Sequence, residues 1–368
     1  MPEDSTLQSR FGRLIACTEV RGDCSEWQVE VNGEPARALA YPSLTGPLRP
    51  GDRVLLNTTA VSLSLGTGGA HFVVACLEPA PVVRDTPSFP GREAGHILKL
   101  RYTPLQLRVC AVEEEESPHR PAFDQFSGLH GTPVVAAELL SQAAAAAIAA
   151  RATGPTLRIV LVHLDSAALP IAFSRVISQL RAAGILDATV TVGQSFGGDY
   201  EAINVYSGLA AARAVAGAEL ILVSQGPGNA GTGTELGFSG LSLVEALHAA
   251  DYLGGEALLI PRLSSADDRL RHQGLSHHTR TILRCLRAPV ALPVPDSDTD
   301  TLLALGPASP HRGIVEDPES AWKALVAARH LLSTMGRELE QDVLFFRTAA
   351  AAGQYSARRA AAHSQPEL

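Results

Sequence analysis

The densest group of titratable side chains in this 368-residue sequence lies between positions 262 and 278. The group consists of Arg262, Asp267, Asp268, Arg269, Arg271, His272, Ser276, His277 and His278. Ser276 is a natural N-cap for the helix HHTRTILRCLR, which would place both adjacent histidines in its first turn. The positive end of a helix lowers the affinity of an imidazole for a proton. We therefore expect neutral imidazoles there, able to accept a proton or to ligate a metal ion.

The spacing of the three histidines limits which of them can act together. Neighbouring helical residues point about 100° apart, so we expect His272 to meet only one of His277 and His278. Such a pair could bind a divalent metal ion together with an acid, either Asp267 or Asp199. The spacing matches no established metal motif, however, so the metal and any cofactor remain unassigned.

Two other interpretations of the same cluster remain open. His272 or His277 could move protons beside a bound anion, to which Arg262 and Arg271 would donate charge-assisted hydrogen bonds. His278 and Asp267 would then belong to the same catalytic group. The third interpretation is a purely structural polar network.

Two glycines and two acids follow the apolar run ATVTVGQ. Gly197 and Gly198 would let the backbone approach a ligand, and Asp199 and Glu201 come next, at the expected start of a helix. The two carboxylates could take part in acid–base chemistry. They could instead only cap the helix, whose dipole favours anions at that end.

The most glycine-dense stretch, residues 226–237, follows the apolar run ELILVSQ. Its first six residues match a dinucleotide-binding pattern, but no helix opens directly after them and the next strand ends in Arg262 instead of an acid. A loop that cradles an anion fits better, with the backbone at Gly228 and the hydroxyls of Thr232 and Thr234 as donors. The alternative is a long loop that packs against its neighbours.

These loops follow short apolar runs that are typical of a parallel sheet buried on both faces. LRIVLVHL, ATVTVGQ, ELILVSQ and ALLIPR each precede a polar loop and a helix, and APVALP and RGIV add two further strands. Ligands of such sheets bind at the carboxyl ends of the strands, so Asp165 is a further ligand-binding candidate, with helix capping as its alternative role. We expect the alanine-rich VVAAELLSQAAAAAIAAR to be a surface helix.

The whole chain is predicted to be an α/β protein whose doubly wound, mostly parallel sheet follows a small all-β barrel or sandwich. Residues 1–95 would form the β domain with its Pro/Gly-rich linker, because short β-rich runs there alternate with tight-turn residues. Residues 96–335 would form the α/β ligand-binding domain. Residues 336–368 read as a C-terminal helical segment that packs on a domain or on a second subunit, which makes a homo-oligomer possible.

The composition favours a globular cytoplasmic protein. A net charge of -8 at pH 7 and a pI near 5.8 argue against a nucleic-acid partner. From its first residues and its longest apolar runs, we expect neither a secretory signal nor a membrane span. Its five scattered cysteines suit a reducing compartment.

Several of these segments together carry a family resemblance. They are GQSFGGDYEAINVYSGL, SQGPGNAGTGTELGFSG, RLSSADDRLRHQGLSHHT, ALPIAFSRV and the Met335-Gly336-Arg337 start of the tail. Joined in this order, they make the sequence similar to the domain of unknown function 3866 family of bacterial proteins over most of its length. The resemblance supports the architecture and implies no catalytic residues.

The sequence thus predicts an enzyme that binds a small anionic molecule at the strand ends, with histidine and carboxylate acid–base chemistry and an unknown reaction. The alternative is a non-catalytic sensor or scaffold whose same loops bind a metabolite while the β domain contacts another protein.

Overall fold

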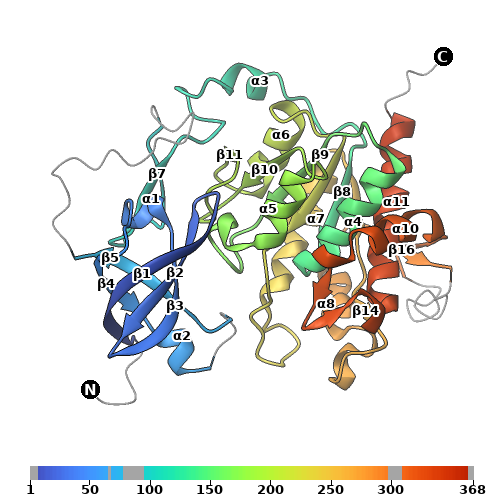
Figure 1. Cartoon of the computed structure of the whole chain (residues 1–368). Coiled ribbons are helices and arrows are strands. Elements are labelled where there is room, and N and C mark those ends of the chain that lie inside the picture. Colours follow the sequence, from blue (N-terminus) through green and yellow to red (C-terminus); the bar gives the residue numbers. More distant parts are fainter. Residues whose placement is uncertain (1–6, 65–67, 78–94, 297–308, 364–368) are drawn as a thin grey trace. The chain divides into compact units, whose positions relative to one another are not determined.

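A computed structural model describes residues 7–64, 68–77, 95–296 and 309–363 (Figure 1). The chain divides into two compact units, Met1–Cys110 and Ala111–Leu368. None of the helices in the described ranges is long and apolar enough to cross a membrane.

The described part of the first unit is built around a closed five-stranded barrel with the strand order β1-β2-β3-β5-β4. The strands are β1 (Ser9–Arg21), β2 (Cys24–Val31), β3 (Glu34–Ala40), β4 (Arg53–Asn57) and β5 (Ala70–Cys76). β4 pairs with β1 to close the barrel, and β3 and β5 are parallel, as in an OB-type Greek-key barrel. Alternate residues of each strand point inward, so Leu14, Trp27 and Val54 meet in one core.

Short elements complete the first unit. The helices α1 (Pro42–Thr45) and α2 (Thr59–Ser62) flank β4, and a small antiparallel hairpin joins β6 (Ile97–Lys99) to β7 (Leu107–Val109). The linker residues 78–94 lie outside the described ranges.

The second unit contains, in its described part, an eight-stranded parallel sheet of order β11-β10-β9-β12-β8-β13-β16-β17. Its strands are β8 (Pro133–Ala137), β9 (Ile159–His163), β10 (Ala188–Thr191), β11 (Tyr200–Glu201), β12 (Leu220–Ser224), β13 (Glu256–Leu259), β16 (Ala291–Pro295) and β17 (Arg312–Glu316). The predicted fold class, a doubly wound parallel sheet after a small barrel, is confirmed.

Helices cover both faces of the sheet (Figure 1). One face carries α4 (Leu140–Thr153), α5 (Arg175–Ala182), α10 (Glu319–Ala327) and α11 (Val343–His363), and the other carries α6 (Val205–Ala214), α7 (Leu243–Tyr252) and α8 (His277–Cys285). Side chains of one strand alternate between the two cores, as Val134 and Val135 of β8 do. This alternation explains why the central strands carry apolar residues on both faces.

One predicted element is wrong. The run from Val134 to Arg151 is not one surface helix: its first residues form the central strand β8, and the alanines follow in α4. α4 is buried between the sheet and α11, where an added Cβ on Gly353 would lie 2.2 Å from the Ala146 carbonyl oxygen. The alanines therefore serve close helix packing, which demands small side chains, and not surface helix propensity.

Candidate functional site

Glu138 is the centre of a buried polar network at the carboxyl ends of the strands. It directly follows β8, in the middle of the sheet, and its side chain is 1% exposed. Its Oε1 accepts hydrogen bonds from Arg262 Nη1 at 3.0 Å, His278 Nδ1 at 2.5 Å and Asn229 Nδ2 at 2.5 Å. Arg262 and Asn229 come from the loops after β13 and β12, and His278 lies in the first turn of α8, so Glu138 links the ends of three strands to the start of a helix.

Arg262 connects Glu138 to a second group of charged side chains, in which arginines and aspartates pair with one another. Its Nη2 donates to Asp267 at 3.2 Å, and Asp267 also accepts two hydrogen bonds of 2.9 Å from Arg269. Arg337 pairs with Asp342 at 3.1 Å and lies 3.6 Å from Asp267. Burial alone would raise the pKa of Asp267, but hydrogen bonds from Arg269 and the charges of Arg269 and Arg262 outweigh it and hold the pKa below its usual range.

Three imidazoles converge beside Glu138. His272 ends a short 3-10 turn (Leu270–His272), while His277 and His278 open α8 behind the N-cap Ser276, whose hydroxyl accepts from the His278 amide. The ring centroids lie 4.9 Å apart for His272 and His277, 4.9 Å for His272 and His278, and 4.3 Å for His277 and His278. The expectation that only one helix histidine meets His272 is therefore wrong, because both rings turn toward it despite their 100° offset. Phe238 stacks on His278 at 3.8 Å and 2°, which fixes that ring.

The surroundings of His272 and His277 favour the uncharged form of each imidazole. Burial, followed by the charges of Arg262 and Arg269, lowers the pKa of His272 to about 3. Burial and the neighbouring His278 also lower the pKa of His277. For His277 this direction agrees with the sequence expectation of a neutral imidazole, although burial is the largest cause.

Two polar atoms of the site are buried without a hydrogen-bond partner among the described residues. They are Nε2 of His277 and Oε2 of Glu138. By contrast, Nδ1 of His272 lies 2.8 Å from the Ser276 hydroxyl. Buried polar atoms are nearly always paired in proteins, so two orphans in one cluster point to a ligand.

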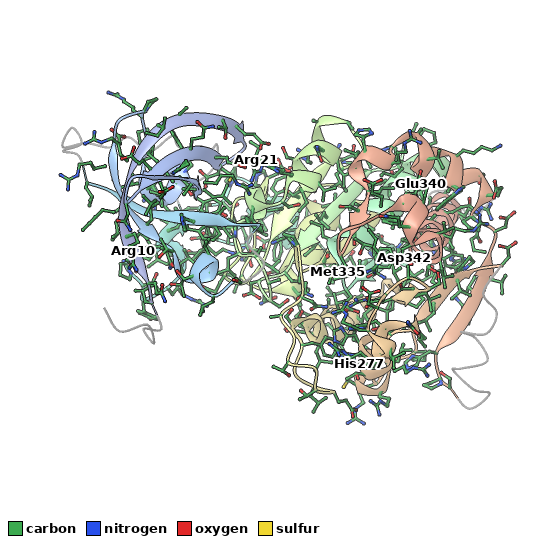
Figure 2. All side chains as sticks on the ribbon, turned by 60° about the horizontal axis from the view of Figure 1, so that its bottom comes forward. Arg10, Arg21, His277, Met335, Glu340 and Asp342 are labelled. Atoms are coloured by element: carbon green, nitrogen blue, oxygen red, sulfur yellow. The ribbon has the colours of Figure 1, made fainter. Side chains whose placement is uncertain are left out.

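The second unit has a pocket of about 380 Å³ among its strand-end loops. It is lined by Leu139, Leu140, Ser141, Phe173, Ser174, Arg175, Val176, Pro227, Gly228, Leu331, Ser333, Thr334 and Met335. Leu139 follows Glu138 in the chain and Gly228 precedes Asn229, so the pocket and the network share two strand-end loops. The first residues of α4 and of α5 line the pocket, and Arg175 is the first residue of α5. Helix amino termini and a guanidinium both suit an anion. Figure 2 labels His277 at the start of α8 and Met335 on the pocket wall, both within the second unit.

The glycine-dense loop divides into an anchored half and an exposed half. Gly228 lines the pocket at a φ of 86°, and an added Cβ there would meet nothing within 4 Å. Thr232 and Thr234 are exposed and hydrogen-bond to each other at 2.8 Å and to Gly237, so their hydroxyls close the loop's own turn. The anchor is Asn229, whose Oδ1 accepts from Gln225, Ser239 and the Gly240 amide.

The loop after β10 is bound to the edge of the sheet. Asp199 accepts from Arg181 Nη2 at 3.0 Å and from the amide and hydroxyl of Thr189, and no helix begins there. Glu201 lies in β11 and accepts from Thr191 Oγ1 at 2.7 Å and from the Gly197 amide. Neither acid caps a helix, since Asn204 caps α6.

Other predicted residues have local partners as well. The Gly198 amide donates to Thr191 Oγ1 at 3.1 Å, and Asp165 accepts from the Gln194 amide at 2.8 Å. Arg271 is exposed beside the histidines, and its charge helps to lower the pKa of His277. The structure thus brings together five of the predicted residues: His272, His277, His278, Asp267 and Arg262. The β10 loop and Asp165 are instead held by hydrogen bonds to their own neighbours.

Sequence reasoning missed Glu138 and Asn229. The signal for Glu138 was the β-branched pair before it, since Pro-Val-Val-Ala-Ala followed by an acid also reads as a buried strand with a polar end. The signal for Asn229 was a lone amide side chain inside a glycine loop, where such a group often bonds to the backbone.

The fold and this network define an α/β protein with a polar strand-end site, preceded by a small barrel. The chain belongs to the family described as "Protein of unknown function (DUF3866)", whose model matches residues 37–353. The resemblance seen in the sequence is confirmed. No curated protein and no solved structure matches the chain.

Proposed function

We propose that this chain is an enzyme that binds a small anionic molecule in the pocket beside Gly228 and acts on it with the adjoining histidine cluster. The observation that carries the proposal is the convergence of the three imidazole rings of His272, His277 and His278 beside the buried carboxylate of Glu138, with His277 Nε2 left unpartnered among the described residues. Perturbed titratable groups in a strand-end cleft are typical of reacting centres.

A reaction at this cluster would use imidazoles whose orientation is already fixed by hydrogen bonds. Glu138 fixes the ring of His278, and the Ser276 hydroxyl orients His272. Fixed, water-poor donors and acceptors need little reorganisation during a reaction. Arg262 is less suited to substrate binding than the sequence indicates, because Glu138 and Asp267 occupy its two Nη atoms. Arg175 is proposed as the anion partner because it lines the pocket at the start of α5.

The alternative function is a non-catalytic metabolite sensor. The self-contained pairing of Arg262, Asp267 and Arg269 favours it, since a rigid network suits binding without turnover. In that case the barrel would contact another protein.

The proposed setting is the bacterial cytoplasm. Cys17, Cys24, Cys76 and Cys285 are free thiols, which fits a reducing compartment. A homo-oligomer through residues 336–368 stays a prediction. It would use surfaces other than Phe345 and Phe346, because both are buried in the chain's own core. The acidic net charge supports a small-molecule partner over a nucleic acid.

A metabolite-depletion assay tests the proposal. The full chain is incubated with phosphorylated and carboxylated metabolites, and mass spectrometry follows both their consumption and their retention. We expect one compound to be consumed by the wild type and by His363→Ala, an exposed control at the end of α11. His277→Ala should bind that compound without consuming it, and Arg175→Met should bind it more weakly.

Retention of a metabolite without consumption would establish the sensor instead. Equal consumption by the wild type and His277→Ala would remove the histidine cluster from the reaction.

A further inference from the structure

The three histidines offer one donor atom each to a common point. One ligand-capable atom from each of His272, His277 and His278 lies within 4.8 Å of the other two. His272 lies in the loop between the paired strands β14 (Leu263–Ser264) and β15 (Gly274–Leu275), and His277 and His278 follow β15 at the start of α8. We propose that His272, His277 and His278 together bind one divalent transition-metal ion, with zinc as the best match.

The hydrogen bonds around the rings leave the outward nitrogens available. Nδ1 of His278 is held by Glu138 at 2.5 Å and Nδ1 of His272 by Ser276 at 2.8 Å, so each ring has Nε2 to offer. Metal-ligating histidines usually have their second nitrogen held in this way, often by a carboxylate. The third ring, His277, has its Nε2 buried and unpartnered among the described residues.

A structural network explains these rings less well. Such a network pairs its buried polar atoms, and here His277 Nε2 has no partner while Glu138 Oε1 takes three donors and Oε2 takes none. A cation bound by the rings would occupy the unpartnered nitrogen. It would also supply positive charge on the side of His278 that faces away from Glu138.

The donor set selects the class of ion. Three imidazoles suit zinc and similar transition metals, whereas magnesium and calcium require oxygen ligands. Three protein ligands leave a fourth position for water or a substrate oxygen, as in catalytic zinc sites. The catalytic meaning of this ion rests on the function proposed above, whereas its binding does not.

The full chain provides the test. Protein treated with a chelator and dialysed is titrated with zinc chloride by calorimetry, and native mass spectrometry counts the bound ions. We expect one equivalent per chain, no binding of magnesium at the same site, and loss of the site in His272→Ala and His277→Ala. Glu138→Gln, which keeps the ligands, should weaken zinc binding about tenfold to a hundredfold.

The controls separate binding from folding and from function. His363→Ala should bind zinc as the wild type does, and circular dichroism should show that half-buried His277→Ala remains folded. Unchanged zinc affinity in His277→Ala, or no tight equivalent in the wild type, would overturn the inference. Zinc binding without turnover of any metabolite would overturn only the proposed function. Turnover that survives chelation, in a chain that binds no zinc, would overturn only the metal site.

Discussion

Replacing Glu138 with Gln tests whether the network at the strand ends depends on its buried charge. The substitution keeps the side-chain volume, so it opens no cavity, but it removes the anion that faces Arg262 in a pair with exposed fractions of 3% and 1%. Breaking a buried ion pair from one side costs about 3–5 kcal/mol. Asp267 remains as a second partner of Arg262, so we expect the lower end, about 3 kcal/mol, or roughly a hundredfold in the unfolding constant.

Urea denaturation followed by tryptophan fluorescence measures this loss in the second unit. A Trp27→Phe background leaves Trp322 of α10 as the single tryptophan, since the chain has two. Glu340→Gln is the matched control, because the Glu340 ion pair with Arg329 is exposed and should contribute no more than about 1 kcal/mol. The m-value should stay constant if only stability changes.

A double-mutant cycle supplies the refutation. Arg262→Met combined with Glu138→Gln should destabilise the unit by clearly less than the sum of the two single changes, because the second change removes a charge that the first leaves unpaired. Strict additivity, or a loss for Glu138→Gln no larger than for Glu340→Gln, would show that the two residues do not act as a buried pair.

Three further predictions concern other parts of the chain. Burial lowers the pKa of His163 to about 4 from 6.5, so the unfolded state binds the extra proton first, and this residue alone should cost about 2 kcal/mol of stability between pH 6.5 and pH 5. Burial lowers the pKa of His272 to about 3, which adds to the same loss, so His163→Asn should reduce the slope in urea titrations at several pH values by its own share and leave the rest. Gly353→Val should cost at least about 1–3 kcal/mol of unfolding free energy, because its side chain would overlap the Ala146 backbone; an unchanged urea midpoint would contradict the close α4–α11 packing. Burial raises the pKa of the Cys24 thiol to about 11, so alkylation at pH 8 should label exposed Cys17 at once and Cys24 only after denaturation, as peptide mass mapping can check.

The fold was largely predictable because burial on both faces leaves a clear mark on a strand. β9, β10, β12 and β13 are short apolar runs with polar loops behind them, and each was placed from that pattern. β8 was missed because its apolar run continues into the alanines of α4 without a turn residue. Periodicity alone cannot separate a buried strand from a buried helix.

The site was predictable only in part, because its centre depends on contacts between distant residues. The histidine loop was identified from its density of titratable groups, but Glu138 lies 140 positions before His278 in the sequence. Local capping rules also failed for Asp199, since the chain after β10 returns to form β11 instead of opening a helix. Only the three-dimensional pairing of strands decides which polar groups share an edge.

Anomalous diffraction from a zinc-soaked crystal tests most directly the central structural claim, that the imidazoles of His272, His277 and His278 share one metal-binding centre beside Glu138. Data collected on both sides of the zinc absorption edge should show one strong peak per chain, about 2.0–2.1 Å from a nitrogen of each of His272, His277 and His278. A map with no peak at these rings, or with its main peak at other residues, would contradict a shared centre.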